Sequence, residues 1–526
     1  MDLDTDVLII GAGLSGLGLA VQLVRQYGHR NFEIIEKTDH IGGTWLTNSY
    51  PGCGVDVAAH YYSYSFCLNP NWSRKFPLQQ EILDYLKGVA SKYDIGKYAR
   101  FHSIVNSAHW DESSRTWLVT VTDLKASETY HRRCKILVSA VGILSLPNGC
   151  DIDGASSFKG PMFHTAQWDH SFDWKDRDMV TAGLPEKSPN SRQAQWIFER
   201  PNPPYSSRFQ WIMKWVPLAM RAYRAMQIYY SELDFYSFPT ESGAGMRKMH
   251  AQTQGAYIQR TSPAKYHEFL IPKTEVGCKR RVMDSDYLQS LHRDNVELVY
   301  EDPIREIVEH GVLTKSGRFV HADAIVLANG FQVQKPLLSL NLFGEGGVSV
   351  AEHWDTFSEG SASSYFGTCL SGFPNFFIMM GPNTASGHGC VTYTTECQIN
   401  FTLRAIKPVL NALRAQRSRL PVIGWKADTV KVKPDAEQAD IDAIQEVAKG
   451  MVWSSGCTSW VLDAESKRNT IMYPGFQYKY WLRSIFIPWK DFDFSAPVSG
   501  SSHPLGIGSF LAISAVIAVV ASICFR

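Results

Sequence analysis

The 526-residue chain lacks an excess of charge of either sign, with 52 Lys and Arg against 51 Asp and Glu and a formal net charge of +1. A balanced charge gives no extended field for nucleic acid, so no nucleic-acid partner is expected. With 44% apolar and 20% charged residues, the chain can bury a core, which excludes wholesale disorder. The length suggests two to four domains at about 150 residues per domain.

Paired cysteines are also lacking. The 10 cysteines are scattered and form no C-x-x-C motif, so neither a zinc site nor a disulfide framework is indicated, and reduced thiols are expected. No metal ligand set is predicted. The first residues, Met1 to Asp4, are acidic and lead directly into a predicted strand, so no secretory signal is expected.

Long uncharged apolar runs are scarce, and the one that stands out is Leu505 to Phe525 (LGIGSFLAISAVIAVVASICF). As a helix it spans about 30 Å, the thickness of one hydrocarbon core. It follows a Ser-, Gly- and Pro-containing stretch from Ser495 to Pro504, which is typical of a linker. We expect a single C-terminal membrane helix with the body of the chain facing the cytosol. The alternative is a buried core helix.

A phosphate-binding loop is predicted near the N-terminus. Val7 to Ile10 is an apolar, β-branched run typical of a strand buried on both faces, and it is followed by GAGLSG at 11–16 and then by a run with helical spacing. In this G-x-G-x-x-G pattern, Gly11 permits a tight turn, Gly13 lets the backbone approach a pyrophosphate, and Gly16 lets helix and strand pack closely. The helix N-terminus then faces the phosphate charge.

The second predicted strand, Phe32 to Ile35, ends at Glu36. An acidic residue at this distance from the glycine loop is able to bind ribose hydroxyls. Because its charge repels a 2′-phosphate, FAD or NAD fits this site better than NADP.

Two longer motifs resemble those of a known family. Residues 42–56 (GGTWLTNSYPGCGVD) match [A/G]-G-x-W-x4-[F/Y]-P-[G/M]-x3-D, and residues 158–169 (FKGPMFHTAQWD) match F-x-G-x3-H-x3-W-[P/D]. Both patterns are those of Baeyer–Villiger monooxygenases, class B flavin monooxygenases that depend on FAD and NADPH. The resemblance runs from about residue 5 to about 490. Trp168 favours this branch over the related N- and S-oxygenases, and His164 is expected to tune the connection between domains.

The resemblance implies an α/β fold with two Rossmann-like dinucleotide-binding domains, FAD in the first and NADPH in the second. It implies an enzyme that inserts one oxygen atom from O2 next to a ketone carbonyl to give an ester or lactone. The residues expected to bind the cofactors are Gly11, Gly13, Leu14, Ser15, Gly16, Glu36, Lys37, Gly43, Thr44, Trp45, Asp56, Tyr62 and, for NADPH, Arg192.

The family places a catalytic Arg after a Lys, just before a strand. By this match Arg280, in Gly277-Cys278-Lys279-Arg280-Arg281, is the catalytic cation, which stabilises negative charge on oxygen. Asp56 is expected to pair with it and hold its guanidinium in place. The alternatives are a solvated loop charge for Arg280 and a turn cap for Asp56. The neighbouring Arg281 leaves the register open.

The chain departs from the family at the second glycine loop. After Val180 the family has a strand, another G-x-G-x-x-G and a helix, but here residues 181–191 read TAGLPEKSPNS, which is typical of a loop. Roughly 20 residues of strand, loop and helix are expected to be missing, so the second domain is predicted to be truncated. Three explanations remain open: an alternative or mis-spliced product, a degenerate enzyme with poor NADPH use, or a rebuilt cofactor site.

The predicted organisation is an FAD domain over 1–155, an NADPH-type domain over 156–335, the rest of the FAD domain over 336–495, and linker and anchor over 496–526. A helical insert at about 211–236 is rich in aromatic residues. In the family this insert lines the substrate pocket, which favours a bulky apolar ketone, with plain core or a second membrane contact as the alternatives. Rival functions are N- or S-oxygenation and a flavin-binding protein with impaired turnover.

Overall fold

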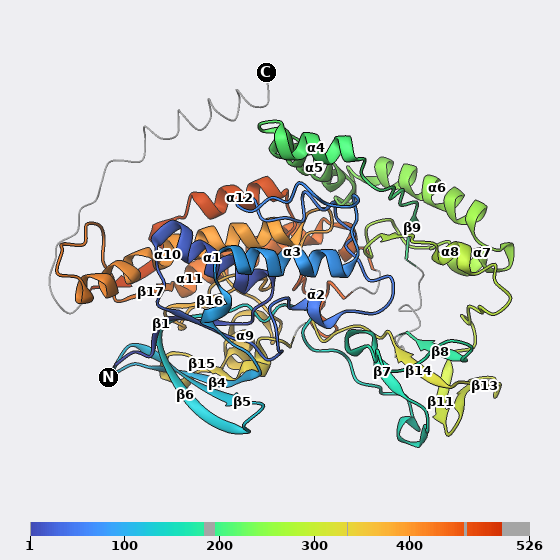
Figure 1. The fold of residues 1–526 in the computed structure, drawn as a ribbon, viewed down its shortest axis with the longest axis horizontal. Coiled ribbons are helices and arrows are strands. Elements are labelled where there is room, and N and C mark those ends of the chain that lie inside the picture. Colours follow the sequence, from blue (N-terminus) through green and yellow to red (C-terminus); the bar gives the residue numbers. More distant parts are fainter. Residues whose placement is uncertain (1, 184–194, 334, 457–459, 497–526) are drawn as a thin grey trace.

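The computed structural model describes residues 2–183, 195–333, 335–456 and 460–496 (Figure 1). Two features of the sequence, Arg192 and the apolar run 505–525, lie outside these described residues. The predicted α/β class is confirmed, since a large mixed sheet is covered by helices and a smaller parallel sheet follows in the second region. The division of the chain into the four predicted segments stays a prediction.

The largest sheet has eight strands in the order β15-β4-β5-β6-β1-β2-β3, with β16 also pairing with β6. β1 lies between β2 and β6, parallel to both. Its side chains alternate between two cores, Val7 and Ile9 on one face and Leu8 and Ile10 on the other, so the strand is buried on both faces as predicted. The strands are β1 (Thr5–Ile10), β2 (Phe32–Ile35), β3 (Ala99–Arg100), β4 (Ser103–Asp111), β5 (Thr116–Asp123), β6 (Glu128–Ser139), β15 (Leu342–Phe343) and β16 (Phe376–Ile378).

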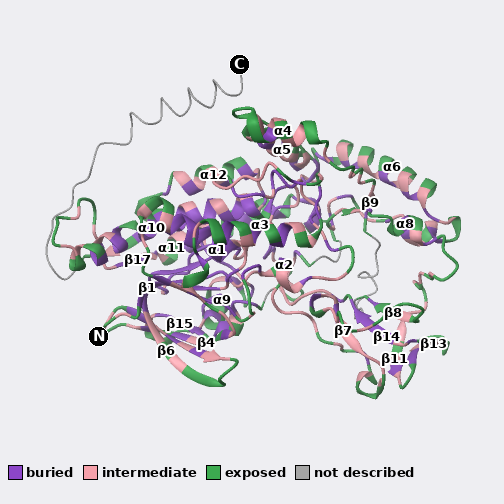
Figure 2. Cartoon of the chain, in the orientation of Figure 1, coloured by how far each residue is buried: buried purple, intermediate pink, exposed green. Residues whose placement is uncertain are grey.

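Helices α1, α3 and α10 cover one face of this sheet, and α9 packs against the other face (Figure 1). Strands β4 to β6 of the sheet pair antiparallel. The purple centre in Figure 2 marks this buried core. The helices of this part are α1 (Leu14–Tyr27), α2 (Thr44–Thr47), α3 (Gln79–Lys92), α9 (Val350–Ser358), α10 (Val391–Arg417), α11 (Pro434–Lys449) and α12 (Gln477–Ile485), and β17 (Thr429–Val432) pairs with β18 (Phe492–Ser495).

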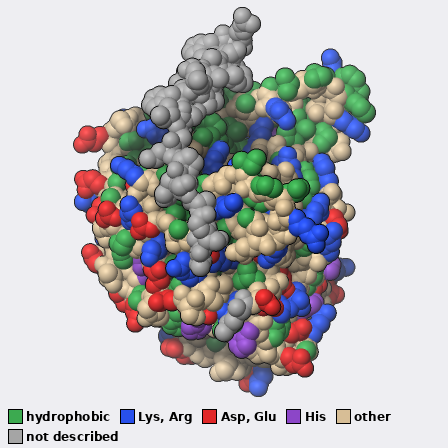
Figure 3. Space-filling model, turned by 90° about the vertical axis from the view of Figure 1, so that its left-hand side faces the viewer, with side chains coloured by type: hydrophobic (Ala, Val, Ile, Leu, Met, Phe, Trp, Pro, Cys, Tyr) green, Lys and Arg blue, Asp and Glu red, His purple; other side chains and the backbone are tan. Residues whose placement is uncertain are grey.

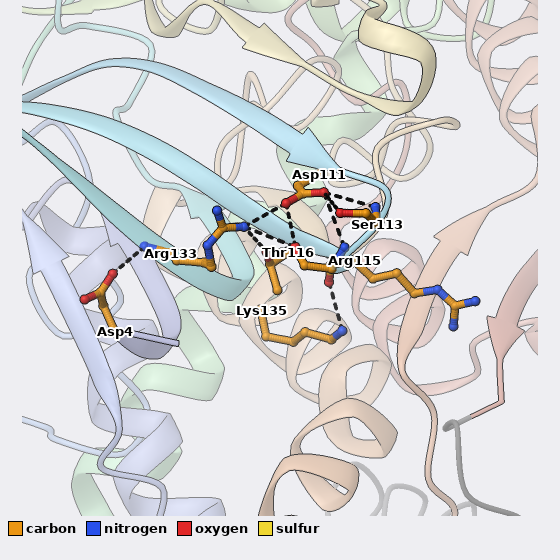
Figure 4. A network of polar contacts seen from close by, with 8 residues as sticks. Asp4, Asp111, Ser113, Arg115, Thr116, Arg133 and Lys135 are labelled. Carbon is orange, nitrogen blue, oxygen red and sulfur yellow. Dashed lines mark hydrogen bonds and ion pairs between the residues drawn. The ribbon is translucent and has the colours of Figure 1, made fainter. Parts of the chain in front are cut away.

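A polar network fastens the β4–β5 turn to β6 (Figure 4). Arg133 Nη1 donates to Asp111 Oδ2 at 2.9 Å and to Thr116 Oγ1 at 2.9 Å, while the backbone N–H of Arg133 donates to Asp4 Oδ2 at 2.8 Å. Hydrogen bonds led by that from Ser113 lower the pKa of Asp111. The carboxylate therefore stays charged and available to Arg133 at neutral pH.

The second region contains a three-stranded parallel sheet in the order β7-β14-β8. The strand that should precede the second glycine loop is present as β8, so the expectation that it is missing was wrong. The remaining elements are β7 (Met162–His164), β8 (Met179–Ala182), β9 (Ile197–Phe198), β10 (Val282–Met283), β11 (Ile304–Val308), β12 (Gly311–Thr314), β13 (Phe319–His321), β14 (Ala324–Leu327), α6 (Ala244–Thr261), α7 (His267–Leu270) and α8 (Tyr287–Ser290).

The predicted helical insert forms two helices, α4 (Ser207–Trp215) and α5 (Ala219–Leu233). The break falls at Pro217, because proline has no backbone N–H to donate to the helical hydrogen bond. Proline also disfavours the helical conformation in the preceding residue, and Val216 is accordingly extended, with φ −83° and ψ 116°. Leu218 then adopts φ +64° before α5 begins.

The cysteine expectation needs one correction. Among the residues that the structure describes, seven cysteines are free, namely Cys53, Cys67, Cys134, Cys150, Cys369, Cys390 and Cys397. Cys278 is disulfide-bonded, so the expectation of reduced thiols throughout was wrong.

The predicted membrane anchor is also corrected. No helix among the described residues has the length and hydropathy needed to cross a membrane. This finding contradicts the predicted membrane localisation and membrane partner, and neither is retained. The run that suggested them lies outside the described residues.

His60 is buried where the insert packs against the region of the large sheet, with 1% of its surface exposed. The rings of Tyr205, Phe209 and Tyr223 meet it edge-on at 5.6, 5.8 and 5.1 Å between centroids. Neither ring nitrogen has a hydrogen-bond partner among the described residues. Burial lowers the pKa of His60 to about 4, so the folded protein keeps this imidazole neutral.

This burial predicts an acid-sensitive contribution to stability. The unfolded chain binds a proton at His60 below about pH 6.5, whereas the folded chain does so only below about pH 4, so stability falls as the pH drops through this window. We expect the unfolding free energy of the wild type to fall between pH 7 and pH 5 by about 2 kcal/mol more than that of His60→Leu. Urea unfolding at both pH values measures this difference, with the exposed His310→Leu as control. Equal falls in wild type and His60→Leu would contradict the prediction.

Candidate active site

The glycine loop joins β1 to α1, and two of its glycine positions, Gly11 and Gly16, have no room for a side chain. Gly11 has φ +104°, and a Cβ there would lie 2.6 Å from the Ala140 carbonyl oxygen. A Cβ on Gly16 would lie 1.9 Å from the Gly11 oxygen, and one on Gly43 would lie 2.7 Å from the Gly13 Cα. Contacts this short exclude any larger residue, so the backbone forms an open cradle at the N-terminus of α1. The residues present therefore fit a pyrophosphate, as FAD carries.

Glu36 follows β2 and is buried beside the cradle. Its Oε2 accepts the backbone N–H of Ala12 at 2.7 Å, and its Oε1 accepts the N–H and hydroxyl of Thr38, both at 2.8 Å. Two carboxylate oxygens offer about four acceptor sites, so Glu36 holds the loop and still has capacity for a ribose hydroxyl. Lys37, the next residue, donates to the Ser145 carbonyl at 3.1 Å.

Other predicted cofactor residues lie around the start of α1 and α2. The Leu14 carbonyl accepts the hydroxyl of buried Tyr64, and Ser15 Oγ lies 3.5 Å from Thr395 Oγ1 of α10. Thr44 is the first residue of α2, next to Gly43. The glycine contact between residues 13 and 43 thus brings α2 against the cradle.

Trp45 of α2 connects the cradle to the predicted catalytic residues. Its indole Nε1 donates to Tyr62 Oη at 2.9 Å, and the two rings meet edge-on at 5.6 Å. Burial, above all, raises the pKa of Tyr62, with smaller electrostatic contributions that include Asp56 and Arg280. Tyr62 therefore stays a neutral phenol, in contact with Trp45 and close to the charges of Asp56 and Arg280.

Arg280 and Asp56 form an ion pair although 224 positions separate them in the chain. Arg280 Nε and Nη2 lie 2.8 and 2.5 Å from the same oxygen, Asp56 Oδ2. The side chains are 38% and 42% exposed, so this pair is open to solvent and to a substrate.

The neighbouring arginine faces elsewhere. Arg281 Nη2 donates to Asp234 Oδ2 at 3.0 Å, and its guanidinium lies over the Phe198 ring at 5.5 Å. Of the two arginines, the structure thus brings Arg280 to Asp56.

Arg200 is a residue that the sequence reasoning missed. It follows β9, its guanidinium lies over the Phe76 ring at 4.4 Å, and its Nη2 donates to the Val55 carbonyl, next to Asp56. Burial lowers its pKa, and the charge of Asp56 opposes that effect. A single arginine in a loop carries no local signal, and only the fold brings it beside Asp56.

His164 ends β7 and is fully engaged with the backbone. Its Nδ1 accepts the N–H of Ala166 at 3.0 Å, and its Nε2 lies 3.0 Å from the Gly330 carbonyl oxygen, which it donates to in this tautomer. Burial lowers its pKa. Trp168 packs edge-on against Phe163 at 5.1 Å. Both side chains thus fasten the loop that follows β7, His164 to the segment after β14 and Trp168 to β7 itself.

Comparisons with known proteins agree with this geometry. A family model described as an NAD(P)-binding Rossmann-like domain matches residues 9–76. A Baeyer-Villiger monooxygenase of Pseudomonas aeruginosa is 32% identical over 90% of this chain and 88% of its own length. One of Streptomyces coelicolor is 32% identical over 89% and 88%, and the FAD-binding monooxygenase ktnD of Aspergillus niger is 30% identical over 92% and 81%.

Solved structures share the fold. The closed crystal structure of cyclohexanone monooxygenase superposes with a TM-score of 0.78 at 23% identity, covering 94% of this chain and 100% of that chain. The OTEMO complex with FAD and NADP gives the same TM-score, identity and coverage. The predicted enzyme class and the predicted cofactors, FAD and NADPH, are confirmed at the level of the family. This chain belongs to the Baeyer–Villiger flavin monooxygenases.

Proposed function

We propose that this chain binds FAD in the first cradle and inserts one oxygen atom from O2 next to a ketone carbonyl, giving an ester or lactone, with NADPH as electron donor. The Arg280–Asp56 ion pair supports this most strongly, because it lies beside the Trp45–Tyr62 pair that contacts the cradle region. We assign FAD to Gly11, Gly13, Leu14, Ser15, Gly16, Glu36, Lys37, Gly43, Thr44, Trp45, Asp56 and Tyr62, and NADPH to Arg192.

The roles of the charged residues follow from their contacts. When bound, the flavin supplies the activated oxygen. Arg280 places a permanent positive charge where negative charge develops on oxygen, and such fixed charges contribute most when they are already oriented. Asp56 orients the guanidinium, since two of its nitrogens bind one carboxylate oxygen. The Nη1 group is left outside this contact and able to donate to the reacting oxygen.

The insert gives little support for a bulky apolar substrate. Trp211, Trp215, Tyr229 and Tyr230, whose side chains suggested an apolar pocket, are exposed on the outer surface of α4 and α5. We therefore propose a ketone substrate without restricting its size.

Reduction of the flavin by NADPH is the step for which the sequence lacks part of the expected binding motif. After β8 the sequence has one glycine, Gly183, where the family has three, so the three-glycine pattern typical of an NADPH cradle is incomplete. This observation favours one alternative, a flavin-binding protein with impaired turnover.

Anaerobic mixing of the purified, FAD-loaded protein with NADPH separates the two. For a working enzyme we expect the flavin absorbance to bleach within seconds to minutes and ester to form when air and ketone are added. Dithionite is the control, because it reduces the flavin without a nucleotide site. Bleaching by dithionite but not by NADPH would leave the alternative as the function of this chain.

A further inference from the structure

The two buried side chains of helix α5 are polar, whereas two of its tyrosines face solvent. Arg224 and Gln227 are buried, with 6% and 9% of their surfaces exposed, whereas Tyr229 and Tyr230 are 62% and 61% exposed. Figure 3 shows hydrophobic side chains gathered on the projecting upper part of the molecule, at the height of α4 and α5 in Figure 1. A helix on a protein surface normally has the opposite orientation, so its buried polar face calls for an explanation.

A cavity of about 440 Å³ lies along this buried face, between α5, α10, α12 and the loop at 65–68. This volume is within the range of small-molecule sites, roughly 300–1,000 Å³. The residues that line the cavity are Ser65, Leu68, Arg221, Arg224, Ala225, Ile228, Tyr393, Glu396, Cys397, Asn400 and Trp481.

The charged part of the wall has one positive charge in excess, because Arg221 and Arg224 stand against Glu396 alone. Both oxygens of Glu396 are engaged: Oε2 lies 3.3 Å from Arg224 Nη2, and Oε1 accepts the backbone N–H and hydroxyl of Ser65 at 2.8 and 2.7 Å. This glutamate therefore does not neutralise both arginines.

Buried polar groups near this wall lack partners. Among the described residues, Arg224 Nη1, both amide atoms of Gln227 and the Tyr61 hydroxyl have no hydrogen-bond partner. Each unpaired buried group of this kind costs about 1–3 kcal/mol. Of these residues Arg224 lines the cavity, so a ligand bound there, or an ordered water, removes the cost at its Nη1.

Most of the rest of the wall is apolar or aromatic, with Leu68, Ile228, Cys397 and Trp481, and Ser65 and Asn400 are its uncharged polar members. An inorganic anion leaves this part of the cavity without a partner, and a phosphate monoester carries more negative charge than the one positive charge in excess. A ligand with one carboxylate and an apolar body matches both parts.

We propose that this cavity binds a monocarboxylate with an apolar body, at a site separate from the Arg280–Asp56 pair. Each site lies near one of two consecutive tyrosines, and the cavity lining does not include Arg280 or Asp56. Tyr61 interacts electrostatically with Arg224, whereas Tyr62 does so with Asp56 and Arg280. The inference does not depend on the proposed oxygenation.

Calorimetric titration of the full-length, FAD-loaded protein with sodium octanoate tests the site. We expect one octanoate per chain, with binding at least tenfold weaker for 1-octanol and absent for inorganic phosphate. Arg221→Gln should weaken octanoate binding at least tenfold, because it removes the excess charge while leaving the Arg224–Glu396 pair intact. Arg224→Gln should also weaken octanoate binding at least tenfold. If the loss of the buried Arg224–Glu396 pair unfolds that variant, Arg221→Gln still tests the contribution of the positive charge.

The matched controls are Arg208→Gln, a surface arginine of α4 outside the cavity wall, and Arg280→Ala at the reaction site. Both should leave octanoate affinity unchanged. Loss of binding in Arg280→Ala would place the carboxylate at the reaction site and overturn the proposal. Equal binding of octanoate and octanol, or no binding by the wild type, would also overturn it, and water would then satisfy the buried polar groups.

Discussion

Arg280→Ala is expected to abolish ester formation while flavin reduction stays close to wild type. The substitution removes the positive charge that stabilises negative charge on oxygen, and losing one such group typically lowers turnover by about 100-fold or more. Reduction does not require that charge, since the cradle and Glu36, to which we assign FAD, are not altered. Stopped-flow absorbance measures reduction, and gas chromatography of the ketone and ester measures the product.

Arg281→Ala is the matched control, because this arginine contacts Asp234 and Phe198 instead of Asp56. It should retain most of the ester formation. If Arg281→Ala loses the product and Arg280→Ala keeps it, the assignment of the catalytic cation is in the wrong register. Asp56→Ala should fall between wild type and Arg280→Ala, because the cation remains but is no longer oriented.

Gly16→Ala is expected to yield a protein without bound FAD. The new Cβ would lie 1.9 Å from the Gly11 carbonyl oxygen and 3.2 Å from Ile9 Cγ2, and the nearest atom is backbone that has no room to turn away. α1 therefore has to move from β1, which opens the cradle. We expect destabilisation of about 2–4 kcal/mol and loss of most bound flavin. Flavin absorbance per chain and thermal unfolding measure the two effects.

Gly88→Ala provides the comparison, since a Cβ at Gly88 of α3 meets no atom within 4 Å. Alanine favours a helix interior over glycine, so this variant should keep its flavin and gain about 0.5–1 kcal/mol of stability. Retention of flavin in Gly16→Ala at wild-type level would contradict the steric argument.

The sequence predicts the cradle well because all its determinants are local. Residues 7–16 and the acid at Glu36 lie within one βαβ unit, and the structure has this strand, helix and strand where the pattern placed them. The break at Pro217 was also open to prediction, since the chemistry of proline fixes it.

The catalytic pair was not open to prediction from local pattern. Asp56 and Arg280 are far apart in sequence, and only the family resemblance connected them before the fold placed them in contact. Arg200 had no signal at all. The aromatic insert misled for a physical reason: its composition indicates burial, but the two buried side chains of α5 are polar, and composition does not specify which side of a helix faces the protein.

The topology of the eight-stranded sheet also has a consequence for the order of folding during synthesis. Strand β16 (Phe376–Ile378) pairs with β6, and α10, which starts at Val391, packs on α1. During synthesis, α1 is therefore complete more than 360 residues before the helix that covers it. Contacts this distant in sequence close slowly. A nascent chain released before α10 is made therefore carries its cradle on an uncovered hydrophobic face, which gives chaperones a defined segment to protect.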